Sequence, residues 1–432
     1  MPTLTYTDTG LAASTTYQYR VRAKNSSGVS AWSNTASATT FAAPPATPTF
    51  TVQATTQTTI ATRITGDSMA TYKIEVSHPS TPTAWRTVHN GTITPTDSNL
   101  DFNITGLMPG VEYNIRVTAY NSEGTPSASS ATGTGATKSI MLYVGTVTTT
   151  TAKVNFDNIT GATNYDIDVT TDNPGGSPTW TNKYSGAGTV DGAQRTTTLT
   201  GLTAGTTYYI RGRARNATEN GGYSALVTAV LIPAAPTGVQ AAATSTTAIK
   251  VDWTAVPGAA SYIVERSANG TSGWTSVGTP TTNQFTNSSL TTGTTYYFRV
   301  FAVNSGGQSA ASSVVSATTS VTAPPTPTGF TATVVSDSRI DLSWSSAAGA
   351  VSYLVEKSTD QSNWTTAYNG AATSVQVTGL ASDTMHYFRA RATNAGGDSA
   401  WSTTISKATL PVTPTLTVIG TTQTSVTIRI NA

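Results

Sequence analysis

One short phrase recurs five times along the chain, and it limits the possible folds more than any other feature. In each copy a leucine stands six residues before a large ring-bearing side chain. The leucines are Leu11, Leu107, Leu202, Leu290 and Leu380, which lie 96, 95, 88 and 90 residues apart. A repeat period near ninety residues equals one small domain, so the sequence predicts a tandem array of similar domains.

The phrase itself has the pattern of a β-strand. In the copy that starts at Leu290, the apolar residues Tyr296, Phe298, Val300 and Ala302 alternate with residues that face the other way. A second alternating strand stands upstream in each full copy, beginning at Tyr72, Tyr165, Tyr262 and Tyr353. Short alternating strands without a helical period predict an all-β sandwich in each repeat.

Large side chains mark two further positions of each full copy. An earlier strand carries one large apolar residue, which we expect in the core: Ile64, Phe156, Trp253 and Trp344. A single tryptophan follows the second strand: Trp85, Trp180, Trp274 and Trp364.

With these positions in place, the chain resembles the fibronectin type III family of bacterial type over nearly all of its length. The likeness rests on the leucine-to-tyrosine spacing, the strand ending in Arg-x-x-Asn and the early core tryptophan. It implies immunoglobulin-like β-sandwiches in an elongated tandem array, each with a tyrosine corner whose hydroxyl bonds to nearby backbone. The corner positions are Tyr17, Tyr113, Tyr208, Tyr296 and, as a departure, His386, which we expect to leave its copy less stable.

The repeat divides the chain into four complete domains between two partial ones. The predicted ranges are 1–40 (C-terminal half), 45–137, 138–231, 233–319, 324–409 and 412–432 (N-terminal half). Most joints carry prolines, such as Pro44-Pro45 and Pro324-Pro325, which favour semi-rigid extended linkers. Glycines replace them in Thr132–Ala136, so we expect the softest joint there.

The two partial domains correspond to each other across four repeats. Ser30-Ala31-Trp32-Ser33 recurs as Ser399-Ala400-Trp401-Ser402, and Thr55–Thr58 recurs as Thr421–Thr424. The simpler interpretation is that the sequence is a window of a longer array. The alternative is head-to-tail completion between copies by strand addition, which would leave the middle strands missing and a hole in the core.

Composition narrows the classes of partner. The chain has 23 basic and 21 acidic residues, a net charge of +2 and a charged fraction of 10%. So few charges of nearly balanced sign give a weak electrostatic field, which predicts no nucleic-acid binding. No stretch is long and apolar enough to predict membrane insertion. There is no cysteine, so neither disulfides nor thiolate metal sites are available. The expected partners are copies of the chain or neighbouring domains of a longer chain.

The titratable residues predict neither an enzyme nor a cofactor site. Catalysis needs convergent groups, whereas we expect the three histidines, His78, His89 and His386, in separate loops or in a corner of the core. Acidic residues of the second strand are expected to pair across the sheet with the arginines of the repeated phrase, as exposed ion pairs of little energy. The predicted pairs are Asp166 and Asp168 with Arg211 and Arg213, Glu75 with Arg116, Glu265 with Arg299, and Glu356 with Arg389 and Arg391.

The sequence suggests two kinds of carbohydrate site, for covalent attachment and for binding. Asn-x-Ser/Thr triplets mark possible glycosylation at Asn25, Asn90, Asn103, Asn158, Asn216, Asn269, Asn287 and Asn363. The loop Asn216–Tyr223 and the turns that carry tryptophan are candidate glycan contacts.

Three functions fit a tandem array without catalytic residues. The first is an extracellular structural or spacer array, as a surface fibre, filament or adhesin stalk. The second is a bacteriophage tail-fibre or tail-tip component, which would place the chain in a virion. The third is the accessory stalk of a secreted polysaccharide-degrading enzyme.

Overall fold

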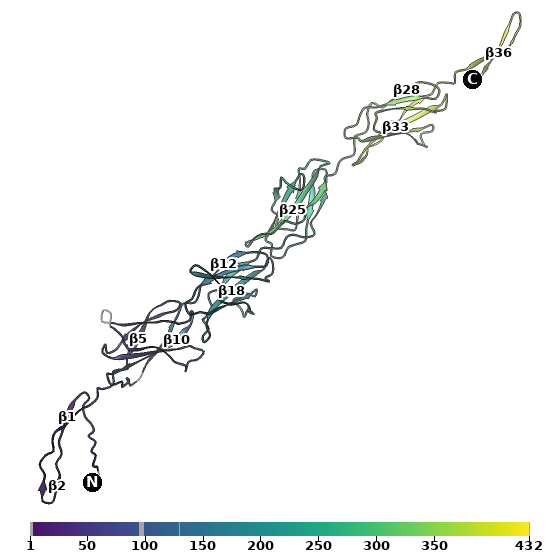
Figure 1. Ribbon diagram of the computed structural model, residues 1–432. Helices are drawn as coiled ribbons and strands as arrows, with labels where there is room; N and C mark the ends of the chain where they lie inside the picture. Colours follow the sequence, from purple (N-terminus) through teal and green to yellow (C-terminus); the bar gives the residue numbers. More distant parts are fainter. Residues whose placement is uncertain (1–2, 95–98, 129, 432) are drawn as a thin grey trace. The chain divides into compact units, whose positions relative to one another are not determined.

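A computed structural model describes residues 3–94, 99–128 and 130–431 of the protein. Within these residues every regular element is a β-strand, as Figure 1 shows. The strands form four sandwiches, preceded by a set of short strands and followed by one hairpin. The predicted all-β tandem array is therefore confirmed.

The first two sandwiches take up the strands β5 to β19. The first contains β5 (Thr49–Thr55), β6 (Ile60–Thr65), β7 (Thr71–Ser77), β8 (Arg86–Thr92), β9 (Leu100–Ile104), β10 (Glu112–Tyr120) and β11 (Ala131–Ala136). The second contains β12 (Leu142–Val147), β13 (Ala152–Asp157), β14 (Asn164–Thr170), β15 (Thr181–Gly186), β16 (Thr189–Asp191), β17 (Gln194–Leu199), β18 (Thr207–Arg215) and β19 (Val227–Val230).

The next two sandwiches repeat the same plan. The third contains β20 (Gln240–Ala243), β21 (Ile249–Asp252), β22 (Ser261–Ser267), β23 (Thr275–Gly278), β24 (Gln284–Asn287), β25 (Thr295–Asn304), β26 (Gly307–Gln308) and β27 (Val315–Thr318). The fourth contains β28 (Thr331–Val334), β29 (Ile340–Ser343), β30 (Ser352–Ser358), β31 (Thr365–Gly370), β32 (Ser374–Val377), β33 (Met385–Asn394), β34 (Gly397–Asp398) and β35 (Ile405–Ala408).

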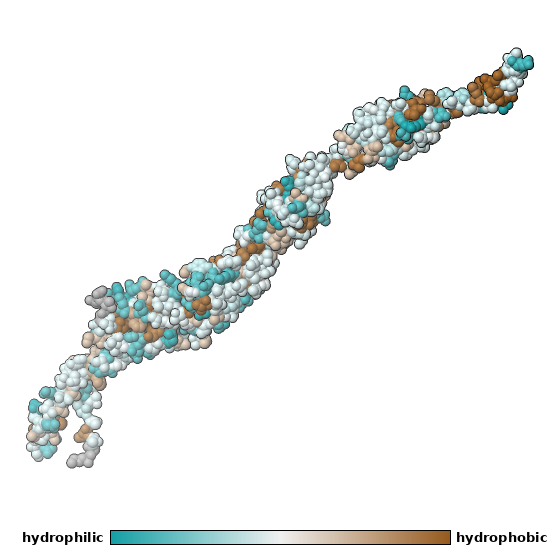
Figure 2. Space-filling view, turned by 45° about the horizontal axis from the view of Figure 1, so that its top comes forward, coloured by the Kyte–Doolittle hydropathy of each residue, from teal (hydrophilic) through white to brown (hydrophobic). Residues whose placement is uncertain are grey.

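The segments at the two ends hold fewer strands and bury little. The N-terminal segment contains β1 (Thr16–Tyr19), β2 (Lys24–Asn25), β3 (Gly28–Val29) and β4 (Ala36–Thr39). The C-terminal hairpin pairs β36 (Thr415–Thr421) with β37 (Val426–Asn431). Its apolar side chains are exposed, for example Leu416 at 65% and Ile430 at 66%. Figure 2 shows them as brown atoms at the C-terminal end of the chain.

Each sandwich places the repeated phrase in the middle of one sheet. In the first sandwich the sheet order is β11-β10-β7-β8, and a second sheet has the order β5-β6-β9. The corresponding strands β18, β25 and β33 are the central strands of the later sandwiches. The predicted upstream strand pairs with the phrase strand antiparallel, with Glu75 opposite Arg116 and Asp166 opposite Arg213.

The core consists of the side chains that the alternating pattern selects. Phe298, Val300 and Ala302 are each fully buried in β25, and the large residues Ile64, Phe156, Trp253 and Trp344 are at most 5% exposed. The hydrophobic effect of this burial holds each sandwich together without disulfides. No helix among the described residues is long and apolar enough to cross a membrane.

The glycines expected in a soft joint lie in a strand instead. Gly133 and Gly135 belong to β11, where they pair with Ile115 and Tyr113 of β10. A Cβ at Gly135 would stand 3.1 Å from the terminal methyl carbons of Ile60 and Ile115. The prediction of a linker here was wrong because these glycines make room for core side chains rather than for chain motion.

Candidate functional site

The tyrosines of the repeated phrase hold the turn that precedes their own strand. The hydroxyl of Tyr113 accepts a hydrogen bond from the backbone N–H of Met108 at 2.9 Å. Tyr17, Tyr208 and Tyr296 each accept the same bond from the residue five positions upstream, at 2.8, 3.0 and 3.1 Å. In the complete sandwiches, the bond ties the loop between the two sheets to the central strand.

A threonine that the sequence analysis overlooked completes this corner. Thr137 follows β11, and its hydroxyl donates to the carbonyl of Met108 at 2.7 Å. The peptide groups of Met108 are thereby held from both sides, by a tyrosine and by a threonine. Thr40, Thr319 and Thr409 donate to the corresponding carbonyls of Ala12, Thr291 and Ala381. The signal in the sequence is a threonine 23 or 24 residues after the corner position.

The corner of the first sandwich also contacts the second. The hydroxyl of Tyr113 donates to the carboxylate of Glu219 at 2.6 Å, and the ring of His78 packs edge-on against the ring of Tyr113. Burial, followed by the bond to Glu219, raises the pKa of the Tyr113 hydroxyl far above its usual range. The hydroxyl therefore stays protonated and can both donate and accept.

His386 reverses the corner bond in the fourth sandwich. The residue is 4% exposed, and its Nε2 lies 3.3 Å from the carbonyl oxygen of Ala381. A carbonyl only accepts, so the imidazole donates here, whereas the tyrosines accept from an N–H. The same carbonyl also takes the hydroxyl of Thr409, so two donors share one acceptor.

Acidic and basic side chains pair across the central strands of every sandwich. Arg116 donates to Glu75 at 2.6 Å, Arg299 to Glu265 at 2.7 Å and Arg389 to Glu356 at 2.6 Å. Arg211 and Arg213 contact Asp168 and Asp166 at 3.4 and 3.1 Å. Arg391 differs from the predicted pairing, because it lies opposite Leu354 and contacts Asp398 at 3.0 Å.

The carboxylates are also far less accessible than expected for surface pairs. The side chains of Glu75, Asp166 and Asp168 are 7%, 10% and 9% exposed. They lie on the outer face of the sheet, but the longer arginines and the neighbouring strand cover them. Their loss would therefore cost more than the loss of an exposed ion pair.

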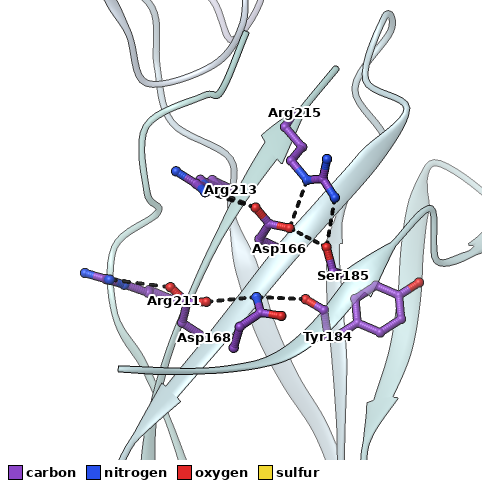
Figure 3. A network of polar contacts seen from close by, with 8 residues as sticks. Asp166, Asp168, Tyr184, Ser185, Arg211, Arg213 and Arg215 are labelled. Atoms are coloured by element: carbon purple, nitrogen blue, oxygen red, sulfur yellow. Dashed lines mark hydrogen bonds and ion pairs between the residues drawn. The ribbon is translucent and has the colours of Figure 1, made fainter. Parts of the chain in front are cut away.

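The densest of these networks surrounds Asp166 on β14, as Figure 3 shows. One carboxylate oxygen accepts from Ser185 at 2.6 Å and from Arg215 at 2.9 Å, and the other accepts from Arg213. Burial alone would raise the pKa of Asp166, but the bonds from Ser185, Arg215 and Arg213 outweigh it and lower the pKa. Arg116 likewise lowers the pKa of Glu75. These groups are ionised and neutralised, which makes them poor acids or bases.

Aromatic rings cover the arginines of these pairs. The guanidinium of Arg211 lies between two rings, 4.0 Å from that of Trp180 and 3.8 Å from that of Tyr223. The other tryptophans that follow the second strand stack in the same way: Trp85 on Arg116, Trp274 on Arg299 and Trp364 on Arg389, at 4.3, 4.4 and 4.2 Å. Each sandwich thus carries a layered carboxylate, guanidinium and aromatic stack, stabilised by cation–π attraction.

Paired serines extend the pairing of the phrase strand where no regular partner strand exists. In the fourth sandwich the hydroxyls of Ser399 and Ser402 accept from the backbone N–H groups of Ala392 and Ala390. Ser309 and Ser312 do the same for Ala302 and Val300 in the third sandwich. The sequence showed the Ser-x-x-Ser spacing as a repeated motif but did not indicate that these serines bind the backbone.

The possible glycosylation sites differ in access. Asn25, Asn90, Asn103, Asn158, Asn269 and Asn363 are exposed, Asn216 is half-buried and Asn287 is 9% exposed. Glycan attaches at Nδ2, and in Asn216 this atom faces the Met108 sulfur at 3.5 Å. Asn287 accepts from Arg266 within the sandwich. Access is therefore poorest at Asn216 and Asn287.

The other candidate residues form no convergent site. His78 bonds to Ser80 and to the carbonyl of Asn220, and His89 to the carbonyl of Gly91. Among the described residues, no group of three or more His, Asp or Glu side chains could hold a metal ion. The loop Asn216–Tyr223 and the turn tryptophan Trp180, both considered for glycan, make contacts within the protein through Glu219, Tyr223 and the ring of Trp180.

The fold, the corners and the stacks define an array of fibronectin type III sandwiches. The chain belongs to this family, since the model described as "Fibronectin type III domain" matches residues 43–134, 234–318 and 324–408. Among solved structures the chain is similar to the chicken CNTN1 FN1–FN3 domains, with 20% identity and a TM-score of 0.26, covering 62% of this chain and 97% of that one.

Two relatives are bacterial proteins that are named for enzyme activities. Exoglucanase B of Cellulomonas fimi is 33% identical over 246 residues, which cover 52% of this chain and 22% of that protein. Poly(3-hydroxybutyrate) depolymerase of Ralstonia pickettii is 42% identical over 86 residues, which cover 20% of this chain and 16% of that protein. The matched segments thus span 22% of the length of the first relative and 16% of the second.

Proposed function

We propose that the chain is a non-catalytic, extracellular spacer array, and that it serves as a stalk within or beside a secreted polymer-degrading enzyme. The observation that carries this proposal is the repeated corner and stack, in which the polar side chains bind one another rather than converge on a cavity. Such sandwiches supply length and spacing, and leave chemistry to other domains.

The relatives favour the stalk over the other two functions. Both are named for polymer breakdown, and each resembles this chain over only a small share of its own length. A shared array would connect catalytic and binding parts in all three proteins. A surface fibre and a virion component have no comparable support.

Pulling the full chain by its ends in a single-molecule force experiment tests the spacer function. We expect four separate unfolding events, one for each sandwich, each releasing roughly 300 Å because about ninety residues extend by 3.3–3.6 Å apiece. A single event releasing the whole contour length would contradict an array of separately folded sandwiches. Hydrolysis of cellulose or poly(3-hydroxybutyrate) by the purified chain would overturn the non-catalytic assignment.

Mass spectrometry of the native protein from culture medium separates the stalk from its rivals. We expect peptides of this chain to be found in one polypeptide with peptides of a polymer-degrading domain. Recovery of the chain in purified virus particles, or in surface fibres without such a domain, would contradict the stalk.

A further inference from the structure

The asparagine that ends the repeated phrase caps its own turn in every full sandwich. The Oδ1 of Asn394 accepts the backbone N–H of Gly396 at 2.7 Å. Asn304 accepts from Gly306 and Gly307, Asn216 from Thr218 and Glu219, and Asn121 from Glu123 and Thr125. This half of each amide is used entirely within its sandwich.

The other half of the amide reaches the linker that precedes the same sandwich. The Nδ2 of Asn394 donates to the carbonyl of Thr322 at 2.9 Å, and also to the carbonyl of Gly349 at 3.0 Å. Asn121 donates to Ala42 at 3.0 Å and Asn304 to Leu231 at 2.8 Å. In the second sandwich Asn216 instead faces Met108 of the preceding sandwich.

In the third and fourth sandwiches, the residue two positions after this asparagine is a glycine, Gly306 or Gly396, and it has no room for a side chain. A Cβ at Gly396 would overlap the carbonyl oxygen of Val321 and the carbonyl group of Thr322. Gly306 stands against the carbonyl of Val230 in the same way. The turn therefore contacts the linker through its backbone as well as through the asparagine Nδ2 donor.

The linker is held from its other side by the preceding sandwich. In the joint before the fourth sandwich, the N–H of Ser320 donates to the carbonyl of Ser245 at 3.2 Å, and the N–H of Thr319 to Thr294 at 3.1 Å. Only Val321 separates Ser320, bound to the third sandwich, from Thr322, bound to the fourth. So short a free segment leaves little freedom for the joint.

We propose that this asparagine and its glycine form an interdomain latch, whose partner is the linker of the same chain. In the third and fourth sandwiches, the donated bond and the close backbone contact hold the linker on the turn and restrict bending at the joint. The inference deepens the proposed spacer function by naming what stiffens it, but it can be tested whether or not the chain is an enzyme's stalk.

The variant Asn394→Asp removes the donor of the latch, together with its bond to Gly349 within the sandwich. Aspartate keeps the Oδ1 acceptor that caps the turn, but it replaces the Nδ2 donor with an oxygen that repels the carbonyl of Thr322. Gly396→Ala is the second variant, because it displaces the linker while Asn394 keeps its bond to Gly349. Asn269→Asp is the matched control, since Asn269 caps a turn of the third sandwich and bonds only within that turn.

Spin-label distances on the full chain give the measurement. The protein has no cysteine, so Ser276→Cys and Thr366→Cys place one label on each of the third and fourth sandwiches without background. We expect the width of the distance distribution to increase about twofold in Asn394→Asp and Gly396→Ala, and to stay unchanged in Asn269→Asp. Hydrogen exchange of β33 in the same samples reports whether the sandwich remains folded.

Two results would overturn the latch. One is an unchanged distribution width in both variants while β33 remains protected from exchange. The other is equal broadening in the Asn269→Asp control. If β33 loses protection in Asn394→Asp, Gly396→Ala decides alone, because its side chain points at the linker. Neither result depends on catalysis or on which domains are joined to the chain. Failure of the latch is therefore distinguishable from failure of the stalk.

Discussion

At the tyrosine corner, one residue is held by side chains through both its backbone N–H and its backbone carbonyl. Met108 is fixed through its N–H by Tyr113 and through its carbonyl by Thr137. Thr291 is held by Tyr296 and Thr319 in the same way. A buried backbone group without a partner costs stability, so this arrangement explains why hydroxyl side chains stand at the chain crossing.

Replacing the odd corner residue should stabilise its sandwich. In His386→Tyr the phenol can accept the N–H of Ala381, which restores the arrangement of the other copies and leaves the carbonyl to Thr409. We expect a gain of about 1 kcal/mol, one net hydrogen bond. Hydrogen exchange of β33 in the full chain should slow several-fold. The reverse change in an intact corner, Tyr208→Phe, should speed exchange of β18, and faster exchange in His386→Tyr would contradict the argument.

The stability of the second sandwich should depend on the protonation of Asp166. The pKa of this carboxyl is lower in the folded state than in the unfolded state, so its contribution is present above the unfolded value near 4 and is lost as pH falls through the folded value. One such group changes stability by at most about 1.4 kcal/mol per pH unit. Urea unfolding between pH 5 and pH 2 should therefore show a shallower dependence in Asp166→Asn than in the natural chain.

At the scale of strands, the stack on the outer face joins two strands and two loops through one side chain. Arg211 on β18 contacts Asp168 on β14, the ring of Trp180 just before β15, and the ring of Tyr223 on the far side. The planar guanidinium suits this arrangement because it can pair at its edge while its two faces stack.

A lysine cannot replace the guanidinium in this stack. Arg211→Lys keeps the charge beside Asp168 but loses the two flat contacts, so we expect a loss of about 1 to 2 kcal/mol in the second sandwich. Pulse proteolysis of the full chain in urea would measure it. Arg63→Lys is the control, since Arg63 and Asp101 form an exposed pair and should unfold at the same urea concentration as the natural chain. Equal midpoints for both variants would show that stacking adds nothing.

The glycines of β11 give a second prediction at this scale. A valine at Gly135 would push into Ile60 and Ile115, and overpacking of this kind costs about 1 to 3 kcal/mol. Gly176→Val is the matched control, because a Cβ there meets only ordinary contacts. Calorimetry should show a lower melting temperature for the first sandwich in Gly135→Val alone. A neutral result would contradict the argument that Gly135 makes room for these core side chains.

The strands were predictable from the sequence where their pattern of burial is visible in neighbouring residues. Alternation at Tyr296–Ala302 reports burial directly, and acid–arginine pairs follow once two strands are known to be neighbours. The glycines of β11 were misassigned because composition cannot tell a linker from a strand whose glycines make room for Ile60. Thr137 was missed because its partner is set by the path of a loop, which no periodicity records. Arg391 was mispaired because the strand register places it opposite Leu354 and not opposite Glu356.

At the scale of the molecule, the first two sandwiches share more than a linker. Their buried side chains form one continuous cluster, from Ile60 to Leu231. The contact of Tyr113 with Glu219 lies beside a backbone bond from Gly222 to Pro109, and His78 bonds to the carbonyl of Asn220. The loop between β18 and β19 therefore acts as part of the preceding sandwich's corner.

Such sharing predicts that a change in the second sandwich loosens the first. Glu219→Ala removes the acceptor of the Tyr113 hydroxyl, a charge-assisted bond worth about 1 to 2 kcal/mol, so exchange protection in β10 should fall about tenfold although no residue of the first sandwich has changed. Glu123→Ala is the control, since Glu123 is exposed in the turn after β10, and it should leave β10 unaltered. If Glu219→Ala affects only β18 and its neighbours, the two sandwiches are independent and the shared cluster does not couple their stability.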